Sequence, residues 1–163
     1  MRELKRQPIV AVCGAGHADA ALDAMAEAVG RGIAAAGAAL VCGGLGGVMA
    51  AACRGARAAG GLTIGILPGA DTRAANPDVL IPIATGMGEA RNAIIVHTAD
   101  VVIAVGGEYG TLSEIALARK IGRTVVGLNT WALGQSATGQ PHLLIVNTPE
   151  EAVATALAHC DRS

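Results

Sequence analysis

Short runs of β-branched and other apolar residues alternate along this chain with longer alanine-rich stretches of helical periodicity. The runs that predict strands are residues 8–13, 39–42, 62–67, 79–83, 101–105, 124–128 and 143–146. The stretches that predict helices are residues 18–35, 47–59, 89–98, 111–121 and 149–159. Strands that are apolar on both faces and alternate with helices predict a Rossmann-like α/β fold, with three α/β/α layers and a mostly parallel sheet of about seven strands.

Length and composition indicate one domain with an aliphatic core. The 163 residues predict a single domain over residues 1–163, large enough to bury a core without a disulfide or a metal. Although 52% of the residues are hydrophobic, the chain has one Trp, one Tyr and no Phe. Its core must therefore consist mainly of Ala, Val, Ile and Leu. Polar segments at 69–78 and 131–142 predict surface loops.

Charge and cysteine spacing exclude several classes of partner. The net charge is −1 and the only lysines are Lys5 and Lys120, so we expect no nucleic-acid partner. No apolar run approaches the roughly 20 residues of a membrane span, and the charged N-terminus leads directly into a predicted strand. The cysteines have no CxxC or zinc-ligand spacing, so we expect no metal site. Together these features predict a cytoplasmic protein with no membrane partner.

Glycine clusters follow three of the predicted strands, at the carboxyl edge where open α/β sheets bind ligands. The first cluster contains Gly14 and Gly16, which we expect to contact the ligand, with His17 either reaching the ligand or remaining in the turn. The cluster does not complete the dinucleotide-binding GxGxxG pattern, because Asp19 stands where that pattern needs Gly or Ala. The second predicted strand also ends in Cys42 and not in an acidic residue. A nicotinamide-dependent dehydrogenase is therefore not expected.

The second cluster opens the predicted helix that begins near Val48. Glycine lets the backbone approach a ligand closely, and a helix N-terminus offers free N–H groups and a partial positive charge. The predicted phosphate-binding residues of this cluster are Gly43, Gly44, Gly46 and Gly47. The alternative is a tight strand-to-helix turn that needs glycine only for its geometry.

The third cluster repeats this arrangement after the predicted strand at 101–105. Its predicted phosphate-binding residues are Gly106, Gly107, Gly110 and Thr111. Thr111 also suits an N-cap position, and Glu114 follows three residues later, as in a capping box. Glu114 is therefore either a cap for backbone N–H groups or a carboxylate that acts on a ligand.

Two motifs and an arginine between them resemble a known family. Residues 42–49, Cys-Gly-Gly-Leu-Gly-Gly-Val-Met, are similar to the GGGxxGLM turn of the Lonely Guy superfamily, and residues 106–114 are similar to its PGGxGTxxE motif. Members of that superfamily are nucleotide phosphoribohydrolases that release cytokinin bases. The resemblance places the family's catalytic arginine at Arg91 and implies phosphate recognition by the glycine turns.

Arg91 and Glu114 are suited to cleavage of an N-glycosidic bond. A carboxylate at Glu114 would activate water or stabilise the oxocarbenium-like transition state. Arg91 would bind the phosphate through two parallel hydrogen bonds. The alternative for Arg91 is a helix residue that faces water or pairs with Glu89 or Glu114.

The chain departs from the Lonely Guy pattern at three positions. Gly106 replaces the proline of the motif, Glu108 replaces its second glycine, and Asn92 replaces the basic residue that usually follows the arginine. Residues 85–92, which include Met87 and Asn92 as predicted ligand-binding residues, more closely resemble the branch that contains molybdenum cofactor carrier proteins. Both branches imply phosphate recognition, and only the first implies turnover.

The leading hypothesis is a protein that binds a nucleotide-like, phosphate-bearing ligand and hydrolyses a nucleoside 5′-monophosphate, with no cofactor required. The alternative is a non-catalytic carrier for a phosphorylated cofactor such as the molybdenum cofactor. A third possibility is a ligand-sensing module that works with a partner protein. Apolar residues at 94–96 also predict a homo-oligomer, a dimer or tetramer, with His97 in the core or at the interface.

Overall fold

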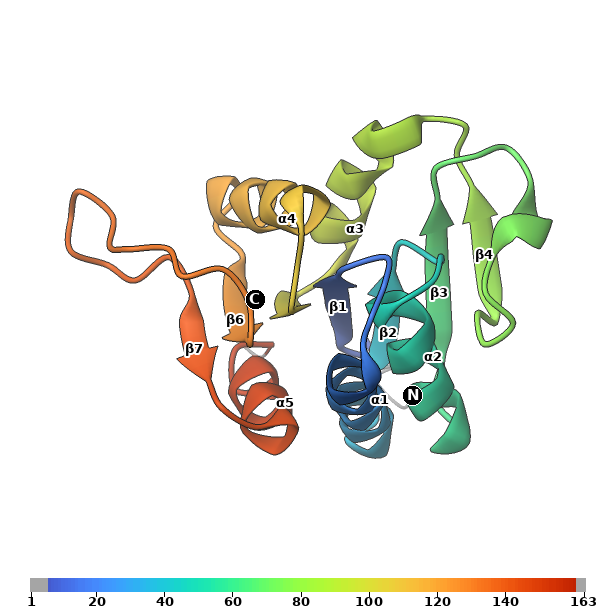
Figure 1. Cartoon of the computed structure of the whole chain (residues 1–163), viewed down its shortest axis with the longest axis horizontal. Coiled ribbons are helices and arrows are strands. Elements are labelled where there is room, and N and C mark those ends of the chain that lie inside the picture. Colours follow the sequence, from blue (N-terminus) through green and yellow to red (C-terminus); the bar gives the residue numbers. More distant parts are fainter. Residues whose placement is uncertain (1–5, 161–163) are drawn as a thin grey trace, which may run out of the picture.

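A computed structural model describes residues 6–160 as a seven-stranded parallel sheet flanked by helices (Figure 1). The strands are β1 (Ile9–Gly14), β2 (Ala39–Cys42), β3 (Thr63–Leu67), β4 (Ile81–Ala84), β5 (Val101–Val105), β6 (Thr124–Leu128) and β7 (Leu144–Val146). The α-helices are α1 (Ala20–Ala35), α2 (Val48–Ala58), α3 (Asn92–Thr98), α4 (Tyr109–Lys120) and α5 (Pro149–Leu157). Two short 3₁₀ helices are η1 (Thr72–Ala74) and η2 (Gly88–Arg91). The predicted Rossmann-like α/β fold is confirmed.

The strand order is β4-β3-β2-β1-β5-β6-β7. The chain builds the sheet outward from β1 in one direction as far as β4 and then returns to place β5 on the other side of β1. The boundary between β1 and β5 is therefore the point where the strand order reverses. In open α/β sheets, ligands bind outside the carboxyl ends of the strands at such a point.

Helices cover both faces of the sheet, with α1, α2 and α5 on one side and α3 and α4 on the other (Figure 1). Side chains alternate along β1 accordingly. Val10 and Val12 belong to the core beneath α1, α2 and α5, whereas Ala11 and Cys13 belong to the core beneath α3 and α4. Both cores are aliphatic, as the composition predicts.

Helices α1 and α2 touch through glycine. A Cβ atom at Gly30 would lie 1.9 Å from the carbonyl oxygen of Ala52, and one at Gly55 would lie 1.9 Å from that of Glu27. Only glycine therefore permits this backbone approach. At the surface of the same helix pair, Arg54 bridges Asp23 and Glu27.

Several predicted boundaries are corrected. Helix α4 begins at Tyr109, two residues before the predicted start, so its N-cap is Glu108 and not Thr111. The helix begins earlier because Gly106 and Gly107, both with positive φ, complete the turn after β5 in two residues. The capping-box interpretation of Thr111 and Glu114 is therefore wrong. The helix predicted at 89–98 is divided into η2 and α3.

The apolar stretch that predicted an oligomer interface lies mostly inside the chain. Ile95 and Val96 are fully buried, while His97 is exposed and does not belong to the core. Exposed apolar side chains lie instead on the edge strand β4, where Ile81 and Ile83 are 44% and 43% exposed. Across residues 6–160, no helix is both long and apolar enough to cross a membrane.

Candidate functional site

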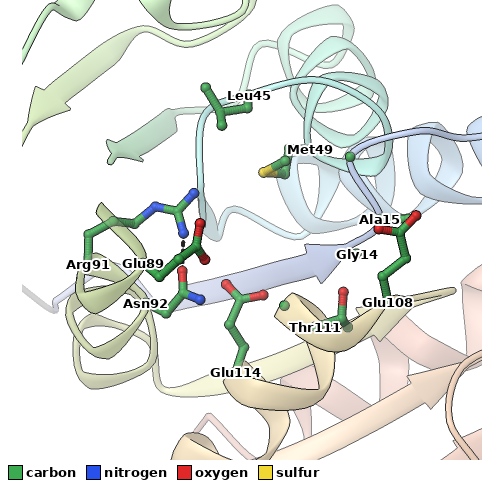
Figure 2. A pocket seen from close by; sticks show the side chains of 12 residues that line it. Gly14, Ala15, Leu45, Met49, Glu89, Arg91, Asn92, Glu108, Thr111 and Glu114 are labelled. Atoms are coloured by element: carbon green, nitrogen blue, oxygen red, sulfur yellow. Dashed lines mark hydrogen bonds between the residues drawn. The ribbon is translucent and has the colours of Figure 1, made fainter. Parts of the chain in front are cut away.

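A cavity of about 190 Å³ opens at the carboxyl ends of β1 and β5, where the strand order reverses (Figure 2). It is lined by Gly14, Ala15, Gly16, Leu45, Met49, Glu89, Arg91, Asn92, Glu108, Gly110, Thr111 and Glu114. These residues come from the end of β1 and the turn after it, from the turn after β2 and the start of α2, from η2 and the start of α3, and from the turn after β5 and the first two turns of α4. Four segments distant in sequence therefore build one site.

Arg91 is held rigidly in the wall of this cavity. Its side chain is only 6% exposed, its Nε donates a hydrogen bond to the carbonyl oxygen of Ile66 at 2.8 Å, and its Nη1 donates to the Oδ1 of Asn92 (Figure 2). No ion pair joins it to Glu89 or Glu114 among the contacts of residues 6–160. Neither alternative for Arg91, facing water or pairing with a glutamate, is realised. A fixed, buried guanidinium without a carboxylate partner is suited to an anionic ligand.

Gly43 makes room for that guanidinium. A Cβ atom at Gly43 would lie 2.8 Å from both the Nη2 of Arg91 and the Sδ of Met49. Gly43 does not line the cavity, but its missing side chain allows two residues that do line it to take their positions.

Glu114 projects from α4 into the same cavity and is 8% exposed (Figure 2). Burial raises the pKa of its carboxyl from 4.5 to about 7, against the opposing effects of a hydrogen bond with Cys13 and of the positive charge of Arg91. Burial, followed by the charge of Glu114, raises the pKa of the Cys13 thiol well above its usual value. Glu114 is therefore poised to change its charge near neutral pH, as groups in functional sites often are.

The N-terminus of α4 supplies a second anion-binding element. The described hydrogen bonds include no protein acceptor for the amides of Gly110 and Thr111, and both residues line the cavity. The N-cap residue Glu108 makes no side-chain hydrogen bond to the helix. Free amides at a helix N-terminus favour a phosphate or carboxylate.

The rim of the cavity is acidic. Glu89 and Glu108 are exposed, and together with Glu114 they oppose a single guanidinium, that of Arg91. A phosphate in this site is therefore favoured near Arg91 and the amides of α4, away from the two exposed glutamates. Within the described residues, no group of three His, Cys, Asp or Glu side chains is placed to hold a metal ion.

The structure brings seven of the fourteen predicted site residues into the cavity: Gly14, Gly16, Arg91, Asn92, Gly110, Thr111 and Glu114. It places the other seven outside the lining: Gly43, Gly44, Gly46, Gly47, Met87, Gly106 and Gly107. Met87 is half exposed, and Gly106 and Gly107 form the turn behind the site. His17 is exposed and does not line the cavity.

Five lining residues were not predicted to bind ligand: Ala15, Leu45, Met49, Glu89 and Glu108. Three of these residues lie within or beside the glycine motifs, and that position in the sequence could have indicated a place in the site: Ala15, Leu45 and Met49. The side chains of Glu89 and Glu108 are brought to the cavity by η2 and by the early start of α4, which the sequence did not predict.

The N-termini of α1 and α2 each donate at least one amide to an acceptor within the protein. Asp19 caps α1 by accepting a hydrogen bond from the amide of Leu22 at 2.8 Å, and the amide of Val48 in α2 donates to the carbonyl oxygen of Ala15 at 3.0 Å. The residue that interrupts the GxGxxG pattern is thus the helix cap itself. Arg91 and the amides of Gly110 and Thr111 are available as donors for an anion, and the amide of Met49 in α2 likewise has no acceptor among the described hydrogen bonds.

One protein sequence and two solved structures are similar to this chain over most of its length. An uncharacterized protein of Archaeoglobus fulgidus is 45% identical over 144 residues, which are 88% of this chain and 91% of that protein. The structure of the molybdenum cofactor binding protein of Rippkaea orientalis is 38% identical, with a TM-score of 0.85 over 94% of this chain and 98% of that one. The molybdenum cofactor carrier protein of Chlamydomonas reinhardtii is 36% identical, with a TM-score of 0.83 over the same shares.

The family assignment follows from a match along most of the sequence. The model of the SLOG cluster4 family matches residues 7–153, which include every residue that lines the cavity. This chain belongs to the SLOG cluster4 family.

Proposed function

We propose that this protein is a carrier that binds the molybdenum cofactor at the β1–β5 cavity and releases it unchanged. The observation that carries the proposal is the likeness, over nearly the whole chain, to two structures described as a molybdenum cofactor binding protein and a carrier protein. The resemblance of residues 85–92 to the carrier branch supports the same function. This proposal reverses the order of the two hypotheses drawn from the sequence.

The chemistry of the cavity fits a phosphate-bearing pterin. Arg91 and the amides of Gly110 and Thr111 provide donors for the phosphate. The raised pKa of Glu114, about 7, favours its neutral form toward neutral pH, which lowers the repulsion between this carboxyl and the phosphate. The affinity for the phosphate group is therefore expected to fall as the pH rises through about 7.

Retention of the cofactor tests the proposal directly. Molybdenum cofactor released from a molybdenum enzyme is mixed anaerobically with the protein, and molybdenum and pterin are measured in the protein fraction after gel filtration. We expect stoichiometric retention by the wild type and about tenfold less by Arg91→Ala, because the buried phosphate donor is lost. Arg73→Ala removes an exposed arginine on η1 and serves as the matched control. Equal retention by all three proteins, or none by the wild type, would contradict the proposal.

A second candidate function rests on one specific observation. Arg91 and Glu114, the pair implied by the Lonely Guy resemblance, line the same cavity. This arrangement supports hydrolysis of a nucleoside 5′-monophosphate, with Glu114 ionised to stabilise the developing positive charge on the sugar. Such activity would rise with pH through about 7, opposite to the pH trend expected for phosphate binding alone.

Release of ribose 5-phosphate from adenosine 5′-monophosphate separates the two functions. A hydrolase would release it and would lose about 10²–10³-fold in turnover on Glu114→Gln. A carrier would release none at any pH while still retaining its cofactor. Release by the wild type with no effect of Glu114→Gln would exclude Glu114 as the catalytic carboxylate.

We also propose that two copies of the chain associate through the edge strand β4. Leu80, Ile81 and Ile83 are 43–44% exposed there, and an uncovered apolar edge strand is a natural site for pairing. Sedimentation should show a dimer for the wild type and a monomer for the double variant Ile81→Lys and Ile83→Lys. A wild-type monomer at micromolar concentration would refute this interface.

A further inference from the structure

The only two aromatic residues of the chain lie against each other. The sequence contains one Trp, one Tyr and no Phe. The ring centroids of Tyr109 and Trp131 are 5.6 Å apart, and the ring planes are inclined by 45°. Trp131 packs against the aliphatic core beneath α3 and α4, whereas Tyr109 belongs to neither core.

Neither ring lines the cavity, but both adjoin residues that do. Tyr109 is the first residue of α4 and stands between Glu108 and Gly110, which both line the cavity. The indole Nε1 of Trp131 donates a hydrogen bond to the carbonyl oxygen of Glu108 at 3.2 Å. The same oxygen accepts the amide of Leu112 at 3.0 Å, so Trp131 is fixed to the N-cap of the helix whose free amides face the site.

Trp131 is partly buried, and Tyr109 is open to solvent. Tyr109 is 81% exposed, the most exposed of the large apolar side chains in the described residues. An aromatic ring left in water forgoes the free energy that burial would give it. A ring of this kind beside a cavity is available to stack on a planar ligand.

We propose that Tyr109 and Trp131 form a stacking platform for the planar heteroaromatic ring of the ligand, a pterin or a purine. The proposal rests on the proposed function, since it assumes that the phosphate of the same ligand lies near Arg91 and the amides of α4. The platform accounts for an exposed aromatic ring, that of Tyr109, beside two residues that line the cavity. It makes the ring, in addition to the phosphate, a determinant of specificity.

The sole tryptophan provides a reporter for this site. Guanosine 5′-monophosphate shares a 2-amino-4-oxopyrimidine ring with pterins, whereas ribose 5-phosphate carries the phosphate without a ring. Guanosine 5′-monophosphate should quench the fluorescence of Trp131 and bind more tightly by calorimetry, and ribose 5-phosphate should bind without quenching. If the nucleotide is hydrolysed, both titrations are made with Glu114→Gln.

Substitutions at Tyr109 give the decisive comparison. Tyr109→Ala should weaken the nucleotide about 10-fold and ribose 5-phosphate hardly at all, because only the nucleotide loses a stacking partner. Tyr109→Phe keeps an aromatic face and should retain the wild-type affinity for both. Since Tyr109 is exposed, both variants are expected to fold, which their melting temperatures will show.

The outcomes separate the platform from the phosphate site. Equal affinity for the two ligands, no quenching, and no effect of Tyr109→Ala would overturn the platform while leaving the phosphate site intact. Quenching by the nucleotide without any binding of ribose 5-phosphate would support the platform and contradict the phosphate site. Failure of both ligands to bind would overturn the platform and the proposed site together.

Discussion

Two glycine turns of this protein look alike in sequence and differ in what they do. The turn at 43–47 follows β2 and opens α2, and the turn at 106–110 follows β5 and opens α4. In the first turn, the amide of Val48 is already bonded to the carbonyl oxygen of Ala15. In the second, the amides of Gly110 and Thr111 have no protein acceptor among the described hydrogen bonds and line the cavity.

The difference lies in what surrounds each turn. The first turn packs against the turn after β1, so its glycines serve close backbone contact: a Cβ atom at Gly47 would lie 2.3 Å from the carbonyl oxygen of Ala15. At Gly110, a Cβ atom would meet nothing within 4 Å. The two turns therefore differ in the space beside their glycines, although the amides of Met49 and Ala50 in α2 also have no acceptor among the described hydrogen bonds.

The largest expected effect is on stability, from Gly47→Ala. Gly47 has φ of 61° and ψ of −131°, a conformation that suits glycine alone, and the added methyl group would collide with backbone atoms that cannot move aside. The free energy of unfolding, measured in urea, should fall by about 3 kcal/mol. A change below about 1 kcal/mol would show that the first turn is more open than its packing indicates.

The next effect is a pH-dependent one at Glu114, one turn into the helix that follows the second glycine turn. Its pKa of about 7 in the folded protein exceeds the ordinary value of 4.5, so the folded state holds its proton more tightly than the unfolded state. This difference in proton affinity contributes about 3 kcal/mol to the free energy of unfolding. The contribution is fully present below about pH 4.5 and is lost as the pH rises to about 7.

Glu114→Gln removes this titration and keeps the size of the side chain. Relative to the variant, the wild type should therefore lose unfolding free energy as the pH rises from 4.5 to 7, and the difference should be constant above pH 7. Effects of other titrating groups cancel in that difference. A difference that stays constant with pH would show that the carboxyl is not perturbed by burial.

A smaller effect, on binding, is expected from Gly43→Ala. The added methyl group would meet the Nη2 of Arg91 and the Sδ of Met49 at 2.8 Å, so the thioether must shift and the guanidinium must be displaced from its hydrogen-bonded position. Stability should fall by about 1 kcal/mol, while the affinity for ribose 5-phosphate falls about 10-fold because the guanidinium moves. Unchanged affinity would show that Gly43 of the first turn does not affect phosphate binding.

The smallest expected effect is that of Gly110→Ala. The position is helical and open, so alanine should raise the free energy of unfolding by about 0.5–1 kcal/mol through its better helix propensity. Its methyl group adds bulk to the lining of the cavity and should weaken phosphate binding. A lower free energy of unfolding for Gly110→Ala would show that the second turn is as closely packed as the first.

The order and type of the strands and helices were predictable, because period and composition are local properties of the sequence. Helix boundaries near the site were less so: the start of α4 depends on how tightly Gly106 and Gly107 turn against their neighbours. A Cβ atom at Gly106 would lie 2.8 Å from Leu22, and one at Gly107 would lie 2.9 Å from Thr111. The contact with Leu22 joins residues far apart in sequence, and no local pattern encodes it.

The sequence by itself determined the parallel α/β sheet, the aliphatic core, and the candidate residues Arg91 and Glu114. Only the tertiary structure decided how closely each glycine turn is packed, because the carbonyl group of Ala15 reaches α2 from another part of the chain. It also decided that Arg91 is fixed in a wall and that Glu114 is buried, which raises its pKa. Burial and hydrogen-bond partners are properties of the assembled chain, so the chemistry of the site emerges only when its four segments meet.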